Sequence, residues 1–528
     1  MQDDLLTKLA KIASLKVISR TSVMGYRDQH NTREIGDALG VTHVLEGSVR
    51  KNGASLHINA QLIDARTDSH IWAEEYNRDL KDMFVLQSEI AQKIAEQLHV
   101  KISPTEKLAI ARPPTADLTA FDLYSRAKSL LPTLSFDRPE QKTNALTAAG
   151  LLNQAVAHDP TFFQAYCQLA WIHDHLYYNG FDRTPARLSL ADAAIQAAFR
   201  LRPDAGEVHL ARAWNLYWGY RDYDGALAEL DIAGKTLPND ARLFELKGYI
   251  ERRRPGGDNQ ALRNLEHAIQ LDPRNIQLLQ QTASSYENLR RYADEKAVWD
   301  RALSLEPGDI QTKVALAFVE FDWKADARPL RQLVDEIRAK DPNSIRSVAD
   351  DWLVCALAER DSAAAANALA AGHEDGMGNE IVKYTSRFME GLVGRMEKDD
   401  AKAHAAFTVA RAEQEKLVRA NPDDAGALAV LGLIDAALGR KEEALHEGRR
   451  AVELLPAEKD SINGAVMIAC LATIAGWVGD KDLACQEIVA SIRYSSYLSY
   501  GQLKLMPEWD PLRGDPCFEE IVASLAPK

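Results

Sequence analysis

The sequence has few cysteines and no surplus of positive charge. Its 528 residues include five scattered cysteines, with no C-x-x-C pair. This pattern is typical of buried thiols in a reducing compartment and does not indicate a disulfide framework or a zinc site. The formal net charge is −14; acidic and basic residues balance over 1–112, so the acidic surplus is spread over 113–528. Nucleic-acid binding requires a basic patch, so we expect no nucleic-acid partner.

Long apolar runs are also scarce. The stretch 462–479 has no charged residue, but it contains Asn463, Thr473 and three glycines. It falls where a repeat helix is due, so we predict a buried helix, with a membrane span as the alternative. The first residues include two acids and no apolar core, unlike a signal peptide. We therefore expect a cytoplasmic protein with no membrane span in this chain.

The sequence also lacks the motifs of common catalytic sites. The segment 233–238 contains Gly-Lys-Thr, but a Walker loop requires glycine at position 229, which is Glu229. We find no Gly-rich kinase loop, no H-R-D, no D-F-G and no H-E-x-x-H. His173 and His175 are two residues apart, which directs them to different faces of a helix, so we interpret them as polar residues of a repeat groove and not as metal ligands. We predict no catalytic residue, no metal ligand and no cofactor.

Residues 1–112 alternate between strand and helix patterns. Leu56, Ile58, Ala60 and Leu62 alternate with polar residues, as in a strand with one buried face. The preceding Asn-Gly pair at 52–53 is a signal for a type I′ hairpin turn. In chain order we expect a helix over 5–12, a strand over 15–20, a helix capped by Asn31 or Thr32 and by Gly40, three further strands, and an amphipathic helix over 83–98.

A different pattern follows a stiff break at 112–118. Alanine-rich helix ends are followed by prolines, most of them 34 or 35 residues apart, with one interval of 80 that we interpret as two units with an insertion. These prolines are Pro160, Pro203, Pro238, Pro273, Pro307, Pro342, Pro422 and Pro456. This is the period of the tetratricopeptide repeat, whose helix pairs stack into a superhelix with a concave face. Leu431-Gly432 marks a close approach of two helices.

The predicted fold is a small α/β domain with a mixed sheet, followed by an all-α tetratricopeptide-repeat superhelix. We place the α/β domain at 1–112, a linker at 113–117, the repeat array at 118–456, and C-terminal helical repeats with a cap at 457–528. The first helix of each repeat faces the concave side, and its second, fifth, ninth and twelfth positions point inward. The candidate partner-binding residues are therefore Gln164, Cys167, Trp171, Asp174, Glu207, Leu210, Trp214, Arg242, Glu245, Tyr249, Arg252, Gln277, Gln280, Ser284 and Glu287.

The segments "LKVISRTSVM", "EIGDALGVTHVLEGSVRKNG" and "INAQLIDARTDSHIWAEEYNRDLKDMFVLQSEIAQKIAEQL" resemble the TolB-amino-terminal-like (FlgO-like) domain of bacterial signalling proteins. In that family the domain joins repeats to a serine/threonine kinase, an adenylate cyclase or a DNA-binding effector. "AYCQLAWIHDHLYY" and the C-terminal "LKLMPEWDPLRGDPCFEEIVASLAPK" look most like kinase-linked members. Members carry an apolar strand about 20 residues before the first helix, which this sequence lacks. The resemblance thus implies an upstream effector; a true start at Met1 is the alternative.

These patterns favour a non-catalytic scaffold of bacterial signal transduction that binds a peptide or protein partner in its concave groove. Two alternatives stay open. The chain is the regulatory half of a kinase or adenylate cyclase whose catalytic domain lies outside it, or it assists envelope or motility assembly.

Overall fold

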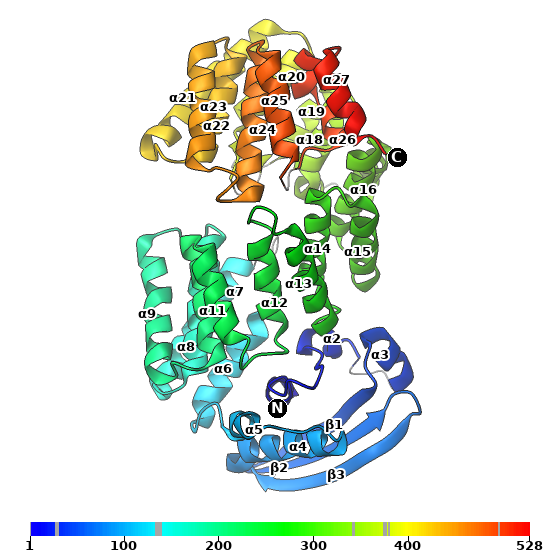
Figure 1. Cartoon of the computed structure of the whole chain (residues 1–528), viewed down its shortest axis with the longest axis vertical. Coiled ribbons are helices and arrows are strands. Elements are labelled where there is room, and N and C mark those ends of the chain that lie inside the picture. The colour runs from blue at the N-terminus through cyan, green and yellow to red at the C-terminus, as the bar shows by residue number, and fades with distance from the viewer. Residues whose placement is uncertain are drawn as a thin grey trace. The chain divides into compact units, whose positions relative to one another are not determined.

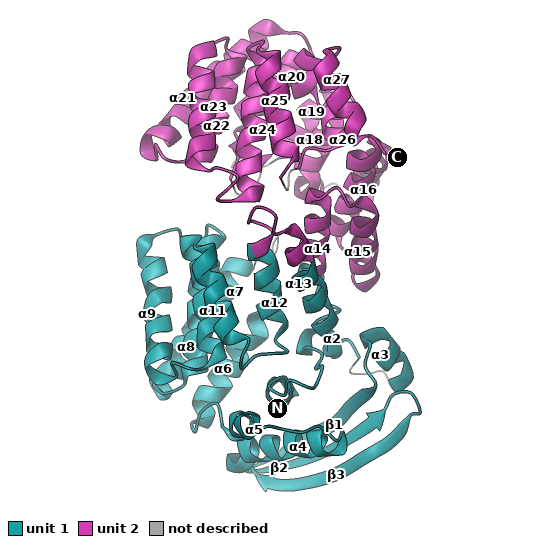
Figure 2. Cartoon of the chain, viewed as in Figure 1, with its two compact units in different colours: residues 1–250, 263–278 teal, residues 251–262, 279–528 magenta. Residues whose placement is uncertain are grey.

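The computed structural model describes residues 2–26, 31–131, 140–340, 344–372, 377–378, 381–494 and 497–527. The chain forms two compact units (Figure 2). Unit 1 comprises Met1–Ile250 and Arg263–Leu278, and unit 2 comprises Glu251–Leu262 and Leu279–Lys528. The chain therefore passes between the units within three consecutive helices of the repeat array.

Unit 1 begins with an α/β part whose core lies between a sheet and a helix (Figure 1). The sheet is antiparallel, in the order β1-β2-β3. On β2, Ile58 and Leu62 pack with Leu86, Ile90 and Ile94 of α4. The elements are α1 (Gln2–Leu9), α2 (Arg20–Met24), α3 (Thr32–Leu39), β1 (His43–Asn52), β2 (Ser55–Asp64), β3 (Ser69–Asp79), η1 (Leu80–Asp82), α4 (Met83–Gln97) and α5 (Pro104–Ala111).

The predicted strand over 15–20 is wrong, and the sheet is antiparallel instead of mixed. Residues 15–19 have no regular structure, and α2 begins at Arg20. The backbone N–H of Ser19 donates to the carbonyl of Leu271, at 2.9 Å, which lies in the repeat array. A β-branched segment forms a strand only where a neighbouring strand can pair with it, and this segment pairs with a helix end instead.

The hairpin and the helix caps follow local signals closely. Asn52 pairs with Ser55, so the loop consists of Gly53 and Ala54, one residue later than predicted. Gly53 has a φ of 58°, and neither neighbour has a positive φ. Glycine at the first central position is typical of a type II′ turn, so the predicted type I′ turn is wrong. The caps of α3 at Asn31 and Gly40 are confirmed.

Helix pairs form the rest of unit 1, and the last of these helices cross into unit 2. After α10 the chain forms one turn of π-helix, η3, before the next helix begins. The elements are α6 (Leu118–Leu130), α7 (Gln141–His158), α8 (Phe163–Tyr178), α9 (Pro185–Leu201), α10 (Gly206–Asn215), η3 (Leu216–Tyr220), α11 (Tyr223–Ala233), α12 (Ala241–Glu251), α13 (Asp258–Leu271) and α14 (Ile276–Asn288).

Unit 2 continues the helix pairs to the C-terminus (Figure 1). Its elements are α15 (Tyr292–Leu305), α16 (Ile310–Lys324), α17 (Arg328–Lys340), η4 (Ser344–Val348), α18 (Ala349–Ala358), α19 (Ser362–Ala371), β4 (Met377–Gly378), β5 (Lys383–Tyr384), α20 (Ser386–Met396), α21 (Asp400–Ala420), α22 (Ala425–Ala437), α23 (Lys441–Leu454), α24 (Ser461–Trp477), α25 (Lys481–Ile492), α26 (Tyr500–Leu505), η5 (Pro507–Leu512) and α27 (Pro516–Leu525).

The proline spacing marks these pairs. Pro160, Pro203 and Pro238 lie between α7 and α8, α9 and α10, and α11 and α12. The interval of 80 residues contains two helix pairs, α18/α19 and α20/α21, and the short strand pair β4/β5. Pro342 lies outside the described residues. The body is thus a helical repeat with the tetratricopeptide period, as predicted.

Two further expectations concern single helices. A Cβ at Gly432 would lie 3.0 Å from the carbonyl oxygen of Ala444, so α22 and α23 meet closely there. The uncharged stretch 462–479 lies almost entirely in α24, whose residues are buried on every side from Gly464 to Gly476. Across the described ranges, the structure contains no helix that is both long and apolar enough to cross a membrane.

Candidate functional site

Aromatic side chains gather on the first helices of three successive repeats in unit 1. We call them the aromatic cluster, which comprises Trp171, His175 and Tyr178 of α8, Trp214 of α10, Trp218 of η3 and Tyr249 of α12. Trp218 is central: its ring centroid lies 4.4 Å from that of Trp214, 5.3 Å from Tyr178 and 5.6 Å from Trp171. The ring centroid of Trp214 also lies 6.4 Å from that of Tyr249.

Helix geometry explains why these rings meet. Positions 171, 175 and 178 are spaced by four and three residues, so they share one face of α8. The chain between Trp214 and Trp218 passes into the π-helical turn, which ends at Arg221 with a left-handed φ of 52°. Such π-helical turns are rare, and they are frequently found at functional sites. Trp171, Trp218 and Tyr178 are partly exposed, whereas Trp214 is buried.

A chain of polar contacts lies beside the aromatic cluster. Asn215 donates to Oδ1 of Asp174, which is fully buried, at 3.0 Å. Arg212 donates to Oδ1 of Asn215 at 2.9 Å and forms an ion pair with Asp192 at 3.5 Å. Tyr220 donates to the other oxygen of Asp192 at 2.5 Å. Burial raises the pKa of Asp174 well above its usual range.

The neighbouring histidines are neutral. Burial lowers the pKa of His173 to about 4, with the charge of Arg187 adding to the effect, and burial lowers that of His175 to about 4. The guanidinium of Arg187 is paired with Asp182 at 2.8 Å. His175 therefore contributes to the aromatic cluster as an uncharged ring.

Four predicted groove residues meet in or beside the aromatic cluster: Trp171, Asp174, Trp214 and Tyr249. The hydroxyl of Tyr249 donates to Glu245 at 2.9 Å, and burial raises the pKa of Glu245 to about 7. These positions come from α8, α10 and α12, as repeat spacing predicts.

Other predicted positions in unit 1 have different surroundings. Cys167 and Leu210 are buried, and Gln164 is partly buried. Glu207 forms an ion pair at 3.0 Å with Lys11, which follows α1. Arg242 pairs with Asp240 at 2.6 Å. Glu207 therefore contacts the α/β part of the same unit.

The remaining predicted positions lie on α14 or just after α12. Arg252 donates to the side chain of Gln281 at 2.8 Å and to Ser285 at 3.1 Å. Gln280 donates to Thr312 at 3.4 Å. Gln277, Ser284 and Glu287 are partly buried.

Glu287 belongs to a group of three carboxyls in unit 2 that we call the acidic triad, with Glu295 of α15 and Asp322 of α16. Burial, reinforced by their mutual charge, raises the pKa of Glu287 to about 8 and of Glu295 to about 9. Burial raises that of Asp322 to about 7. Trp299 donates to Glu295 at 3.1 Å, and Ser499 donates to Asp322 at 2.6 Å.

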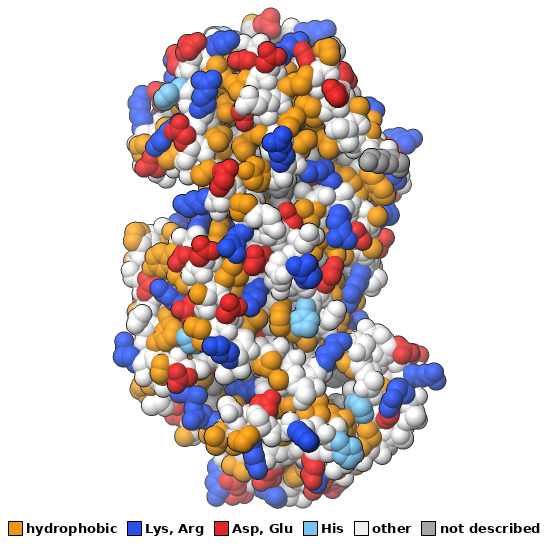
Figure 3. All heavy atoms as spheres, in the orientation of Figure 1, with side chains coloured by type: hydrophobic (Ala, Val, Ile, Leu, Met, Phe, Trp, Pro, Cys, Tyr) orange, Lys and Arg blue, Asp and Glu red, His pale blue; other side chains and the backbone are white. Residues whose placement is uncertain are grey.

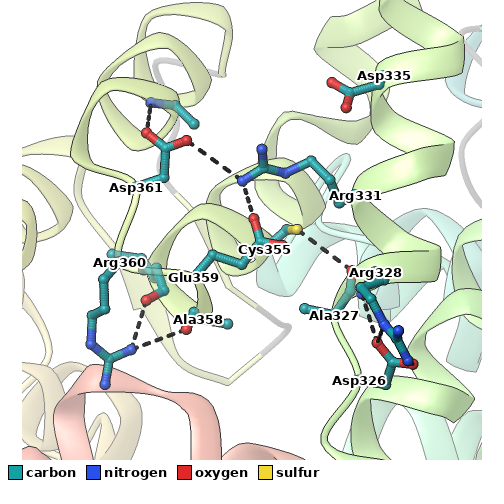
Figure 4. Close-up of polar contacts among 12 residues, drawn as sticks. Asp326, Ala327, Arg328, Arg331, Asp335, Cys355, Ala358, Glu359, Arg360 and Asp361 are labelled. Atoms are coloured by element: carbon teal, nitrogen blue, oxygen red, sulfur yellow. Dashed lines mark hydrogen bonds and ion pairs between the residues drawn. The ribbon is translucent and has the colours of Figure 1, made fainter.

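A shallow hollow of about 600 Å³ lies along α17 in unit 2. One of the charges that line it, Arg331, forms ion pairs with Glu359 and, at 3.5 Å, with Asp361 (Figure 4). Nearby, Arg328 pairs with Asp326 at 2.7 Å. Because these ions are paired with one another, the hollow offers weaker recognition chemistry than the aromatic cluster.

The described side chains contain no group of three or more His, Cys, Asp and Glu residues placed to hold a metal ion.

Acidic and basic side chains are interspersed on the face shown in Figure 3, without a broad basic area.

Sequence reasoning missed Trp218 and Tyr178 as members of the candidate site, and it interpreted His175 only as a polar residue of a repeat groove. The signal was present in the i, i+4 pairs Trp171/His175 and Trp214/Trp218. The inward-position rule takes only four positions from each helix, so it omits the neighbours of those positions on the same face.

No protein-family model matches the chain. A Rhizobium meliloti (strain 1021) protein named "Putative adenylate cyclase 3" is 32% identical over 218 residues, which is 41% of this chain. The match covers 36% of that protein, so the chain corresponds to little more than a third of its length.

Several solved structures are similar at low identity. PilW, a type IV pilus biogenesis factor, matches with 15% identity and a TM-score of 0.34, over 44% of this chain and 99% of its own. The human IFIT1 dimer with PPP-AAAA matches with 16% identity and a TM-score of 0.35, over 71% of this chain and 87% of its own. Yeast Tom70 matches with 13% identity and a TM-score of 0.30, over 78% of this chain and 92% of its own. These scores are low, so the repeat assignment rests on the helix pairs and proline spacing of the chain itself.

Proposed function

We propose that this chain is a non-catalytic protein-interaction scaffold and that it holds a segment of a partner protein against the aromatic cluster of unit 1. The observation that carries the proposal is the partly exposed group of Trp171, Trp218 and Tyr178 on consecutive repeats. Tryptophan and tyrosine dominate the binding energy of protein interfaces, because their rings bury a large area at a small cost in side-chain entropy.

The repeat architecture supports an extended ligand. Stacked helix pairs form an extended concave surface, along which a peptide in an extended conformation can lie. The predicted groove positions of unit 1 that are at least partly exposed, Gln164, Glu207 and Arg242, would extend this contact beyond the aromatic cluster.

A second candidate function is regulation of a longer signalling enzyme. The Rhizobium meliloti relative is named as an adenylate cyclase, and the α/β part resembles domains that accompany kinases and cyclases. In that case the chain supplies the interaction region, and catalysis belongs to a segment outside these residues. The two candidates are compatible, because a scaffold can be part of a regulated enzyme.

The test is a selection of 12-residue peptides that bind the purified full chain, followed by titration of the selected peptides by fluorescence anisotropy. Trp218→Ala should weaken binding by about 2 kcal/mol, or about thirtyfold. Trp323→Ala is the matched control, because Trp323 of α16 is also partly buried and stacks on an aromatic ring, that of Tyr292. If both variants bind the peptides as well as the parent chain does, the aromatic cluster is not the binding surface.

A further inference from the structure

Trp171 and Trp218 differ from other tryptophans of this chain in what lies over their rings. Trp323, Trp352 and Trp477 each have a cation of the chain itself within about 5 Å of the ring centroid: Lys324 at 5.0 Å, Arg338 at 4.5 Å and Arg395 at 4.3 Å. Across the described residues, no lysine or arginine lies over Trp171 or Trp218. Their partly exposed rings are therefore open to a cation from another molecule.

Asp174 places a buried carboxyl on the side of α8 that carries Trp171. It lies three residues after Trp171 and four before Tyr178, on the same side of α8. Its partner Asn215 precedes Trp218 by three residues, so contacts from both helices converge there. Oδ1 of Asp174 accepts from Asn215, but its other oxygen is buried and has no hydrogen-bond partner among the described residues.

The charges around this carboxyl leave it uncompensated. Arg212 is the cation whose charge acts on Asp174, but it pairs with Asp192 and donates to the amide oxygen of Asn215. Arg187 is paired with Asp182, and His173 and His175 are neutral near pH 7. Once these pairs are counted, an ionised Asp174 gives the site one net negative charge.

We propose that the Trp171–Trp218 surface, with Asp174 behind it, binds a lysine or arginine side chain of the partner segment. The inference rests on the proposed function and specifies which residue class the scaffold recognises. The cation lies over the ring faces, where the π-electrons attract it, and Asp174 supplies the opposite charge through a low-dielectric interior.

The protonation of Asp174 fits this role. Without a ligand, burial raises the pKa of Asp174 well above its usual range, which favours the protonated form and avoids a bare buried charge. A cation over the rings favours the ionised form, and the proton is released to solvent. An uncharged side chain of the same length, such as norleucine, would make only apolar contacts with the rings and should therefore bind more weakly.

The experiment uses the full chain labelled with 5-fluorotryptophan and observed by ¹⁹F NMR. The signals of Trp171 and Trp218 are assigned with Trp171→Phe and Trp218→Phe. The probes are the peptides acetyl-Gly-Lys-Gly-amide and acetyl-Gly-norleucine-Gly-amide. We expect the lysine peptide to shift both signals saturably, with about tenfold tighter binding than the norleucine peptide.

Asp174→Asn should reduce this preference to less than threefold while both signals persist, because asparagine has the shape of the neutral carboxyl. Asp122→Asn, at an exposed position of α6, is the matched control and should keep the tenfold preference.

Equal binding of both peptides would overturn the cation proposal but support a peptide-binding aromatic surface. No shift with either peptide up to 50 mM would count against both proposals. A tenfold preference that survives in Asp174→Asn would show that the carboxyl does not supply the charge.

Discussion

The acidic triad should make unit 2 less stable as the pH rises. In the unfolded chain these carboxyls ionise near their ordinary pKa values, 4.5 for glutamate and 3.8 for aspartate. In the fold, Glu295 is only 3% exposed, and burial keeps its proton in place toward a pKa of about 9. The contribution of Glu295 to the free energy of unfolding is therefore fully present below about pH 4, and it is lost as the pH rises from about 4.5 to about 9.

The magnitude follows from the width of that window. Each pH unit between the unfolded and folded pKa values costs about 1.4 kcal/mol per carboxyl. At pH 7, Glu295 alone therefore costs about 3 kcal/mol relative to a side chain that cannot ionise. Glutamine at this position keeps an oxygen for the Trp299 N–H and removes the charge. Glu295→Gln should therefore stabilise the helices α14 to α16 by about 3 kcal/mol at pH 7.

Hydrogen exchange measured by mass spectrometry gives the assay, because it reports the opening of individual helices in a chain with two units. The variant and the parent chain are compared at pH 7.5 and again at pH 5. Protection of peptides from α15 should rise strongly at pH 7.5 and little at pH 5. Asp294→Asn is the control, since Asp294 neighbours Glu295 but is half exposed, and it should change protection by less than about 0.5 kcal/mol.

Two results would refute this reasoning. An unchanged or lower protection at pH 7.5 would show that Glu295 is ionised and stabilised in the fold. An equal gain at both pH values would show that glutamine acts through packing and that proton linkage is not the cause.

Two further predictions concern packing in the α/β part and in the repeats. Burial lowers the pKa of Lys8 to about 8, so the α/β part should gain stability as the pH rises from about 8 to 10.5. Lys8→Met should abolish this rise in denaturant titrations, and a rise that persists in the variant would contradict the prediction. Gly432→Ala should destabilise unit 2 by about 1–3 kcal/mol, because the added Cβ would lie 2.8 Å from Ile474. Gly150→Ala is the control: its Cβ would have nothing within 4 Å, so it should stabilise α7 by up to about 1 kcal/mol in hydrogen exchange. Equal effects at both glycines would be inconsistent with a helix contact at Gly432.

The repeats were predictable from sequence because their signals are local. A proline ends one helix pair and a short turn begins the next, so the spacing of Pro203, Pro238 and Pro273 locates helices without knowledge of distant contacts. The same holds for the cap of α3 at Asn31.

The sequence-based predictions were wrong or incomplete where residues far apart in the sequence determine the structure. Val17 and Ile18 have high β-propensity, yet the segment is held by the array: both Ser19 and Ser22 donate to Asp272, about 250 positions away. Sequence spacing cannot reveal such a partner. The acidic triad was missed for a related reason. Only Glu287 lies at one of the positions that the inward-position rule selects, whereas Glu295 and Asp322 come from other helices.

The contacts of the α/β part also bear on how the repeat array begins. A stack of helix pairs exposes an apolar face at its first helix unless something covers it. Here Phe84 of α4 packs edge-on against Phe121 of α6 at 4.8 Å, and Leu56 of β2 joins the same core. Lys8 ties α1 to α4 and to the end of α5 through Ser88 and the carbonyl of Arg112. The α/β part therefore caps the array, and removing it would expose the apolar side of α6, on which the helices carrying the aromatic cluster are stacked in turn.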